Sequence, residues 1–172
     1  MKQLATTALV NLLLVINVMA NAAEYPKAPE FQLPTQNGNI DLSALQGKVI
    51  YVDFWASWCR PCKNSFPWMI AMKQRFRDKP FEIIAINLDN DKALADEFLA
   101  SQAINFPVGF DPEARIAESY GVEGMPSSFL IDPQGKLRIR YTGFWNKSKN
   151  EKEKSIDDLL KQYKSAPNKP FN

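Results

Sequence analysis

The stretch Trp55-Ala-Ser-Trp-Cys59-Arg-Pro-Cys62-Lys63 contains both cysteines of this 172-residue chain, separated by two residues. It follows the nearly continuous apolar run Val49–Trp55, which predicts a strand buried on both faces. Apolar residues at helical spacing follow it, including Phe66, Met69 and Ile70, and predict an amphipathic helix. Two thiols placed between a buried strand and a helix can close into a disulfide and reopen, so the pair is a candidate for redox chemistry.

The rest of the chain alternates between strand and helix patterns. A short hairpin is expected around Asn37-Gly38, ahead of the central strand. Pro67 should kink the helix after the cysteines, because proline cannot continue its internal hydrogen bonds. Further strands are predicted at 81–88, 106–110, 127–132 and 136–141, and helices at 91–103, 112–120 and 148–165. This order predicts an α/β fold with a mixed central β-sheet, helices on both faces and an N-terminal β-hairpin extension.

Composition limits the function classes. Hydrophobic residues make up 45% of the chain, which is enough for one core, and the formal charge is only +2. Basic residues are interleaved with acids, so no nucleic-acid partner is expected. Histidine is absent, which argues against a Cys-His hydrolase, a histidine-ligated metal and a haem attachment motif. We therefore expect no metal and no cofactor other than the Cys59-Cys62 disulfide.

The first residues have the pattern of a secretory signal. A short positive start precedes a mostly apolar run, and Ala20-Asn21-Ala22 offers the small-x-small pattern of a cleavage site. We interpret residues 1–22 as a cleavable signal peptide and 23–172 as the folded domain. The alternative is an uncleaved membrane anchor, which two asparagines within a run of about seventeen residues disfavour. Export predicts a periplasmic location, where disulfides persist and a reduced dithiol requires an electron supply.

The two cysteines are expected to differ in reactivity. Cys59 lies at the predicted helix N-terminus, where unpaired N–H groups favour the thiolate, and the charge of Arg60 should lower its pKa further. Pro61 fits the first helical turn, and Arg60 and Pro61 are the candidates for tuning the redox potential. Cys62 falls on the apolar face and should be buried. Cys59 would then attack a substrate disulfide, and Cys62 would resolve the mixed disulfide.

Two other interpretations of the pair are a structural disulfide and half of a metal site. A bridge across two residues constrains almost no loop and therefore stabilises little. A tetrahedral zinc site requires four ligands, and the chain has neither further cysteines nor histidines.

Asp53 and Trp58 flank the pair along the chain. Asp53 interrupts the most apolar strand; burial would raise its pKa, so that it could exchange a proton with Cys62. The alternative is a solvated aspartate at a strand end. Trp58 is either an exposed platform beside the thiol or a core residue that reaches the surface.

Met125 and Pro126 precede a predicted strand. If the peptide bond before Pro126 is cis, the Met125 backbone would face the cysteines, whereas a trans proline would simply open an edge strand. The residues alone leave these two possibilities open.

Several motifs together resemble the thioredoxin superfamily, and more narrowly its exported TlpA/ResA/DsbE-like thiol-disulfide oxidoreductases. They are Phe31-x-Leu33, Gly47-Lys48, Val52 to Cys62, Tyr120-Gly-Val, Gly124-x-Pro126 and Phe129 to Gly135. The resemblance covers nearly all of the chain after the signal and implies a thioredoxin-like fold. It also implies that Pro126 is cis and that the Met125 backbone pairs with a bound partner peptide.

Two positions depart from that pattern. ResA-type proteins usually have Glu three residues after the second cysteine, where this chain has Ser65, and they commonly have Asn where it has Asp53. We therefore take Asp53 as the proton-handling group.

These observations predict an exported oxidoreductase that acts as a monomer on protein disulfide or dithiol substrates. We expect it to reduce them, in cytochrome c maturation or a related thiol pathway, with electrons from a membrane electron-transfer thiol partner. The alternatives are a net disulfide oxidase and a thiol-based Cu(I) carrier or binding module. A peroxidase is disfavoured, because the surroundings of a lone peroxidatic cysteine are not evident.

Overall fold

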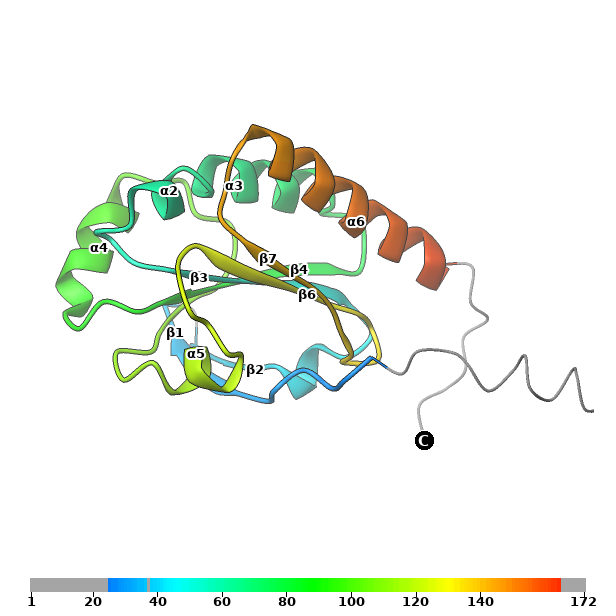
Figure 1. Ribbon diagram of the computed structural model, residues 1–172, viewed down its shortest axis with the longest axis horizontal. Coiled ribbons are helices and arrows are strands. Elements are labelled where there is room, and N and C mark those ends of the chain that lie inside the picture. Colours follow the sequence, from blue (N-terminus) through cyan, green and yellow to red (C-terminus); the bar gives the residue numbers. More distant parts are fainter. Residues whose placement is uncertain (1–24, 37, 165–172) are drawn as a thin grey trace, which may run out of the picture.

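Strand β3 (Val49–Trp55) is the centre of the fold, and all seven of its residues are buried. The computed structural model describes residues 25–36 and 38–164, so the predicted signal peptide and Asn37 lie outside it. In these ranges a seven-stranded sheet has the order β2-β1-β5-β4-β3-β6-β7 (Figure 1). The other strands are β1 (Gln32–Thr35), β2 (Gly38–Asp41), β4 (Phe81–Asn87), β5 (Val108–Phe110), β6 (Ser127–Ile131) and β7 (Leu137–Thr142).

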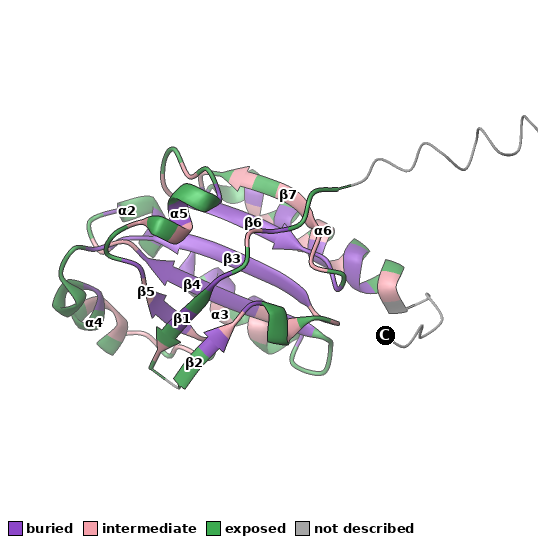
Figure 2. Cartoon of the chain, turned by 90° about the horizontal axis from the view of Figure 1, so that it is seen from below, coloured by how far each residue is buried: buried purple, intermediate pink, exposed green. Residues whose placement is uncertain are grey.

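The sheet is mixed, as the sequence predicted. Strand β4 runs parallel to β3 and β5, while β6 pairs antiparallel with β3 and β7. Figure 2 shows the central strands buried and exposed residues gathered on the helices and the outer loops. The fold class and the N-terminal hairpin extension expected from the sequence are both confirmed.

Helices cover both faces of the sheet. Figure 1 shows α2 (Arg60–Lys63), α3 (Phe66–Arg75) and α6 (Asn146–Lys164) above it, with α5 (Arg115–Ser119) and the β1–β2 hairpin below. The remaining elements are α4 (Lys92–Ala100) and the short 3-10 helix η1 (Ser43–Leu45). Within the described residues no helix has the length and apolar character needed to cross a membrane.

The segment after the cysteines differs from the single kinked helix that we predicted. It forms two helices, α2 and α3, which are separated at Asn64 and Ser65. Pro67 lies in the first turn of α3, where its missing N–H costs little. Because proline has no N–H to donate to the carbonyl of Lys63, the chain breaks the helix there instead of bending it.

The sheet separates two hydrophobic cores. The site-side core lies beneath α3 and α6 and contains Val49, Tyr51 and Trp55 of β3 together with both cysteines. The far-side core faces α5 and the hairpin and contains Ile50, Val52 and Phe54 of the same strand. Alternate residues of β3 thus face opposite cores, which places Asp53 on the same side of the sheet as the cysteines.

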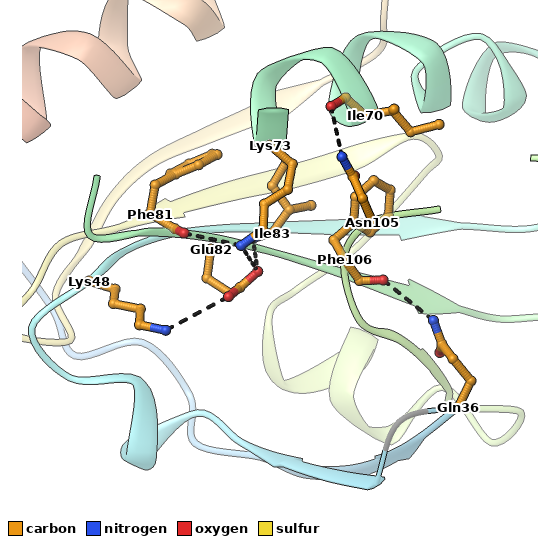
Figure 3. Close-up of polar contacts among 9 residues, drawn as sticks. All are labelled: Gln36, Lys48, Ile70, Lys73, Phe81, Glu82, Ile83, Asn105 and Phe106. Carbon is orange, nitrogen blue, oxygen red and sulfur yellow. Dashed lines mark hydrogen bonds and ion pairs between the residues drawn. The ribbon is translucent and has the colours of Figure 1, made fainter. Parts of the chain in front are cut away.

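Polar contacts fasten α3 to the sheet (Figure 3). Lys73 Nζ lies 2.5 Å from Glu82 Oε1, and Lys48 Nζ lies 3.8 Å from the other oxygen of the same carboxylate. Asn105 Nδ2 donates to the carbonyl of Ile70 at 3.2 Å. Lys73 thus joins α3 to β4, and Asn105 joins the same helix to the segment before β5.

The hairpin extension is attached to the sheet at β5. Gln36 donates through Nε2 to the carbonyl of Phe106 at 3.4 Å (Figure 3) and accepts the Val108 N–H at 3.1 Å. Thr35 pairs with Gly109, where a Cβ would lie 2.0 Å from Leu33 Cδ2. A glycine at this position therefore allows β1 to approach β5 closely.

Candidate redox site

Cys59 and Cys62 form a disulfide at the carboxyl end of β3. Their Cα atoms are 5.2 Å apart. Cys59 is the N-cap residue of α2, and its carbonyl accepts the Lys63 N–H at 3.2 Å. The residue is 5% exposed and Cys62 is fully buried at 0%, which confirms the predicted burial of Cys62. Cys59 is therefore the thiol nearer to solvent.

A buried carboxylate holds the loop that leads to the cysteines. Asp89 accepts the Ser57 N–H at 3.0 and 3.1 Å and the Ser57 hydroxyl at 3.0 Å, and Asn87 Nδ2 donates to it at 2.8 Å. Our sequence reasoning did not identify Asn87 or Asp89. A usable signal was present, because two polar residues end the apolar run of β4, next to the carboxyl end of a parallel neighbour.

The rim of the site is formed by exposed side chains. Trp58 is 69% exposed, so it is not a core residue, and Arg60 and Pro61 are exposed as well. Trp145, which sequence reasoning missed, is also largely exposed and lies close to Gly143, whose N–H donates to the carbonyl of Pro126. The role of Trp58 in substrate binding and the roles of Arg60 and Pro61 in tuning the redox potential stay predictions.

The peptide bond between Met125 and Pro126 is cis, as the resemblance implied. Met125 packs against the site-side core, which contains both cysteines. The carbonyl of Pro126 accepts the N–H of Gly143 at 2.7 Å. Gly143 has φ 80°, and a Cβ there would lie 2.0 Å from the Trp145 ring. The glycine thus lets the Trp145 ring lie close to this backbone, although the roles of Met125 and Pro126 stay predictions.

Asp53 is buried in the middle of the sheet, as predicted, with 1% of its surface exposed. Its Oδ2 atom has no hydrogen-bond partner within the described part of the chain. Burial raises the pKa of Asp53 to about 7, and the positive charge of Lys152 acts in the opposite direction. A carboxyl with such a pKa can change protonation near neutral pH.

Lys152 of α6 lies on the same side of the sheet as Asp53 and is 1% exposed. Its Nζ donates to Ser128 Oγ at 2.7 Å and to the Tyr51 hydroxyl at 3.2 Å. We did not predict this lysine from the sequence. It does lie four residues before Ile156, on the apolar stripe of the last helix, and a charge within that stripe is the signal that could have found it.

Ser65 occupies the position at which ResA-type proteins usually have Glu. It is fully buried, and its hydroxyl donates to the carbonyl of Cys62 at 2.7 Å. The side chain is therefore engaged with the backbone of the thiol loop. In the described residues, no group of three or more His, Cys, Asp or Glu side chains could hold a metal ion.

Comparisons with known proteins agree with this site. The family model described as the AhpC/TSA family matches residues 26–140. The thiol-disulfide oxidoreductase ResA of Bacillus subtilis (strain 168) is 38% identical over 127 residues, which cover 73% of this chain and 71% of that protein. Similar matches of 34% identity occur with ResA of Bacillus anthracis, over 73% of each chain.

Solved structures give the same picture. A candidate thiol:disulfide interchange protein DsbE from Chlorobium tepidum has a TM-score of 0.77 and 44% identity, and the match covers 80% of this chain and 97% of that one. A thiol:disulfide interchange protein of the thioredoxin family from Chlorobium tepidum TLS has a TM-score of 0.69 and 27% identity, over 80% of this chain and 98% of that one.

Proposed function

Because the chain belongs to the AhpC/TSA family and is a thiol-disulfide oxidoreductase of the ResA and DsbE type, we propose that it is exported and reduces protein disulfides outside the cytoplasm. One observation carries this proposal. Cys59, the more exposed of the two cysteines, forms a disulfide with the fully buried Cys62 on the side of the sheet that the buried carboxyl of Asp53 faces. That arrangement places the outer of two thiols and a group that can move a proton on one side of the sheet.

The reaction starts from the reduced pair. The Cys59 thiolate attacks one sulfur of the substrate disulfide, the substrate S–S bond breaks, and the other substrate sulfur leaves as a thiolate with the electron pair. The product is a mixed disulfide between Cys59 and the substrate. Cys59 is assigned as nucleophile because it is the more exposed thiol and caps α2, where the helix N–H groups favour a thiolate.

Cys62 then resolves the mixed disulfide. It passes its proton to the Asp53 carboxylate and attacks Cys59 Sγ, and the second substrate sulfur leaves as a thiolate. The substrate has gained two electrons, and the pair has become the disulfide seen in the structure. An external dithiol must return two electrons before the next cycle.

Substrate binding is assigned to the rim. Trp58 offers a large exposed ring beside Cys59, and the Met125 backbone before Pro126 offers hydrogen-bonding groups for an extended peptide. Arg60 and Pro61 lie between the thiols and tune their redox potential. No cofactor other than the disulfide enters this scheme.

The cellular setting follows from the sequence. Residues 1–22 direct export, and we place the folded domain, as a monomer, in the periplasm. A dithiol kept reduced there requires electrons from a membrane thiol partner. Cytochrome c maturation or a related thiol pathway is the proposed context.

The direction of electron flow is tested by the reduction potential of the Cys59–Cys62 couple, measured by equilibration with glutathione. A reductase requires a potential near that of thioredoxin, about −270 mV. A potential near that of a dedicated disulfide donor, about −120 mV, would support net oxidation instead.

The substrate class is tested by trapping. Cys62→Ser removes the resolving thiol, so the mixed disulfide with Cys59 should accumulate and can be identified by mass spectrometry of an exported fraction. The matched control is Cys59→Ser, which lacks the attacking thiol. Absence of any disulfide-linked protein on Cys62→Ser, or equal capture by Cys59→Ser, would refute the proposal.

A further inference from the structure

We propose that Lys152 is a positioning residue of the redox site, which together with the hydroxyls of Tyr51 and Ser128 holds a positive charge near Asp53 and so sets the pH range of proton exchange with Cys62. The inference rests on the proposed function, because it takes Asp53 as the proton carrier.

The geometry brings the ammonium to the side of the sheet that Asp53 faces. Ser128 is the register partner of Asp53 across β3 and β6, and directly paired residues present their side chains on the same face. Lys152 Nζ donates to Ser128 Oγ at 2.7 Å, and the Tyr51 hydroxyl donates to the same oxygen at 2.7 Å. Lys152 is thus attached to the immediate neighbour of Asp53.

The burial of this lysine requires a compensating charge. An ammonium with 1% exposure has lost nearly all its hydration, which is costly unless it is paired. Its hydrogen-bond acceptors are neutral hydroxyls, and its other close neighbour is the Tyr141 ring, with the centroid 4.3 Å from Nζ. The anion that acts on it is the Asp53 carboxylate.

The effect between the two groups is mutual. Burial lowers the pKa of Lys152 to about 8, and the Asp53 charge opposes that change. Burial raises the pKa of Asp53 to about 7, and the Lys152 charge opposes it. Each ion therefore favours the charged form of the other within the physiological pH range.

Other titratable groups around the pair are less suited to this role. Tyr51 on β3 and Tyr141 on β7 have pKa values raised by burial above their ordinary value, so both stay neutral near pH 7. Glu151 of α6 is exposed and acts on Tyr141. The charged side chains of α3 and α6 that the structure describes on this side are engaged elsewhere: Lys73 pairs with Glu82, Arg75 with Glu153 and Asp157, and Lys149 lies over the Phe144 ring. The thiols of Cys59 and Cys62, once reduced, titrate within the same buried core as the pair.

A purely structural role explains this arrangement poorly. Buried charge pairs are often replaced by apolar residues without loss of stability, whereas removal of one partner is costly. A lysine reaching into the apolar stripe of α6 therefore does little for the fold that a methionine could not do. A charge held next to an ionisable carboxyl does alter proton transfer.

The test is the pH dependence of disulfide reduction by Lys152→Met. Reduced protein is mixed with a fluorescent peptide disulfide, and the single-turnover rate is measured between pH 5 and pH 10. An opposite charge lowers the pKa of a carboxyl by roughly 1–3 units, so its removal should move the rate profile up by at least about one pH unit. At pH 7, where the Asp53 carboxyl is half ionised, a rise of about one unit in its pKa should lower the rate about fivefold, and the rate should recover at higher pH.

The matched control is Lys154→Met, two residues along the same helix. Lys154 is exposed and pairs with Asp158 at 2.6 Å, so its profile should coincide with that of the wild type. A structural role for Lys152 would lower the rate equally at every pH without moving the profile. A Lys152→Met profile that coincides with the wild type, or is lower but unmoved, overturns the proposal. If Lys152→Met does not fold, Lys152→Gln, which keeps a hydrogen-bond donor but no charge, should show the same displacement.

Asp53→Asn separates this inference from the proposed function. If Asp53→Asn leaves the pH profile unchanged, Asp53 is not the proton carrier and the proposed mechanism fails. If Asp53→Asn removes the pH-dependent limb and Lys152→Met does not move it, only the inference about Lys152 fails. In the Asp53→Asn background, Lys152→Met should cause no further change.

Discussion

The two faces of strand β3 meet different surroundings, although they alternate along the same seven residues. On the site side, Tyr51 and Asp53 lie among the polar groups of Ser128 and Lys152. On the far side, Phe54 makes ring contacts at 5.5 and 5.7 Å with Tyr120 and Phe129.

This difference shows how the fold accommodates reactive chemistry. Buried polar groups on the site side have incomplete partners, as the unpaired Oδ2 of Asp53 shows for the described residues. The far side has aromatic packing, and the Tyr120 hydroxyl donates to the carbonyl of Pro29 at 2.9 Å. We infer that the far-side core stabilises the fold. On the site side, burial of the Asp53–Lys152 charge pair lowers stability, and the proposed mechanism uses that pair.

The largest expected effect is a loss of stability on the far side. Phe54→Ala should lower the free energy of unfolding by about 3–5 kcal/mol, because it leaves a cavity in a fully buried aromatic cluster. Denaturant unfolding of the oxidised protein measures this. The reduction potential of the folded variant should stay unchanged. A changed potential would contradict the division of roles between the faces.

On the site side, the oxidised protein should lose stability as pH rises. Asp53 has a folded pKa of about 7 against an unfolded value of 3.8, so the folded state holds the proton more tightly. Its contribution is fully present below pH 3.8 and is lost as pH rises through about 7, with a slope of at most about 1.4 kcal/mol per pH unit. Unfolding at pH 4 to pH 7 measures it, and Asp53→Asn should flatten the dependence. An equally steep Asp53→Asn curve would show that another group is responsible.

Ser128→Ala should have an intermediate effect. It removes the acceptor shared by Lys152 and Tyr51, which leaves buried donors unsatisfied and costs about 1–3 kcal/mol. Ser101→Ala, which loses an exposed hydroxyl contact to the carbonyl of Phe98, is the matched control and should stay within about 0.5 kcal/mol of the wild type. Equal effects of the two variants in thermal unfolding would argue against a network on the site side.

The smallest effect on stability is expected at the rim. Trp58→Ala should change the free energy of unfolding by less than about 0.5 kcal/mol, because the side chain is 69% exposed. The KM for a peptide disulfide should rise several-fold with kcat little changed, since the ring is proposed to bind substrate. Leu94→Ala, exposed on α4, is the control and should leave KM unaltered. A KM unchanged in Trp58→Ala would remove Trp58 from the binding surface.

Much of the fold could be predicted from the chain because its patterns are local. The apolar run at Val49–Trp55 is strand β3 with the same bounds, and the expected hairpin is present as β1 and β2, with Gly38 as the first residue of β2. The burial of Asp53 and Cys62 followed from their apolar neighbours. The break between α2 and α3 was not predicted, because the same proline can either kink a helix or start a new one.

The site was less completely predictable because it depends on contacts between distant segments. Lys152 and Tyr51 are separated by 101 residues along the chain, and Ser57 and Asp89 by 32. No local pattern states which residue on β3 a lysine of α6 will meet. The charge within the apolar stripe of α6 and the polar end of β4 indicate buried polar groups, but not their partners.

The most direct test of the mechanism is the reduction of insulin disulfides, followed by precipitation of the freed chain, with wild type, Cys59→Ser and Cys62→Ser compared under one dithiol supply. Cys59→Ser should fall to the rate of the uncatalysed reaction, because the attacking thiol is gone, and Cys62→Ser should stall as a mixed disulfide. Insulin reduction by Cys59→Ser at a rate close to that of the wild type would contradict the assignment of Cys59 as the nucleophile.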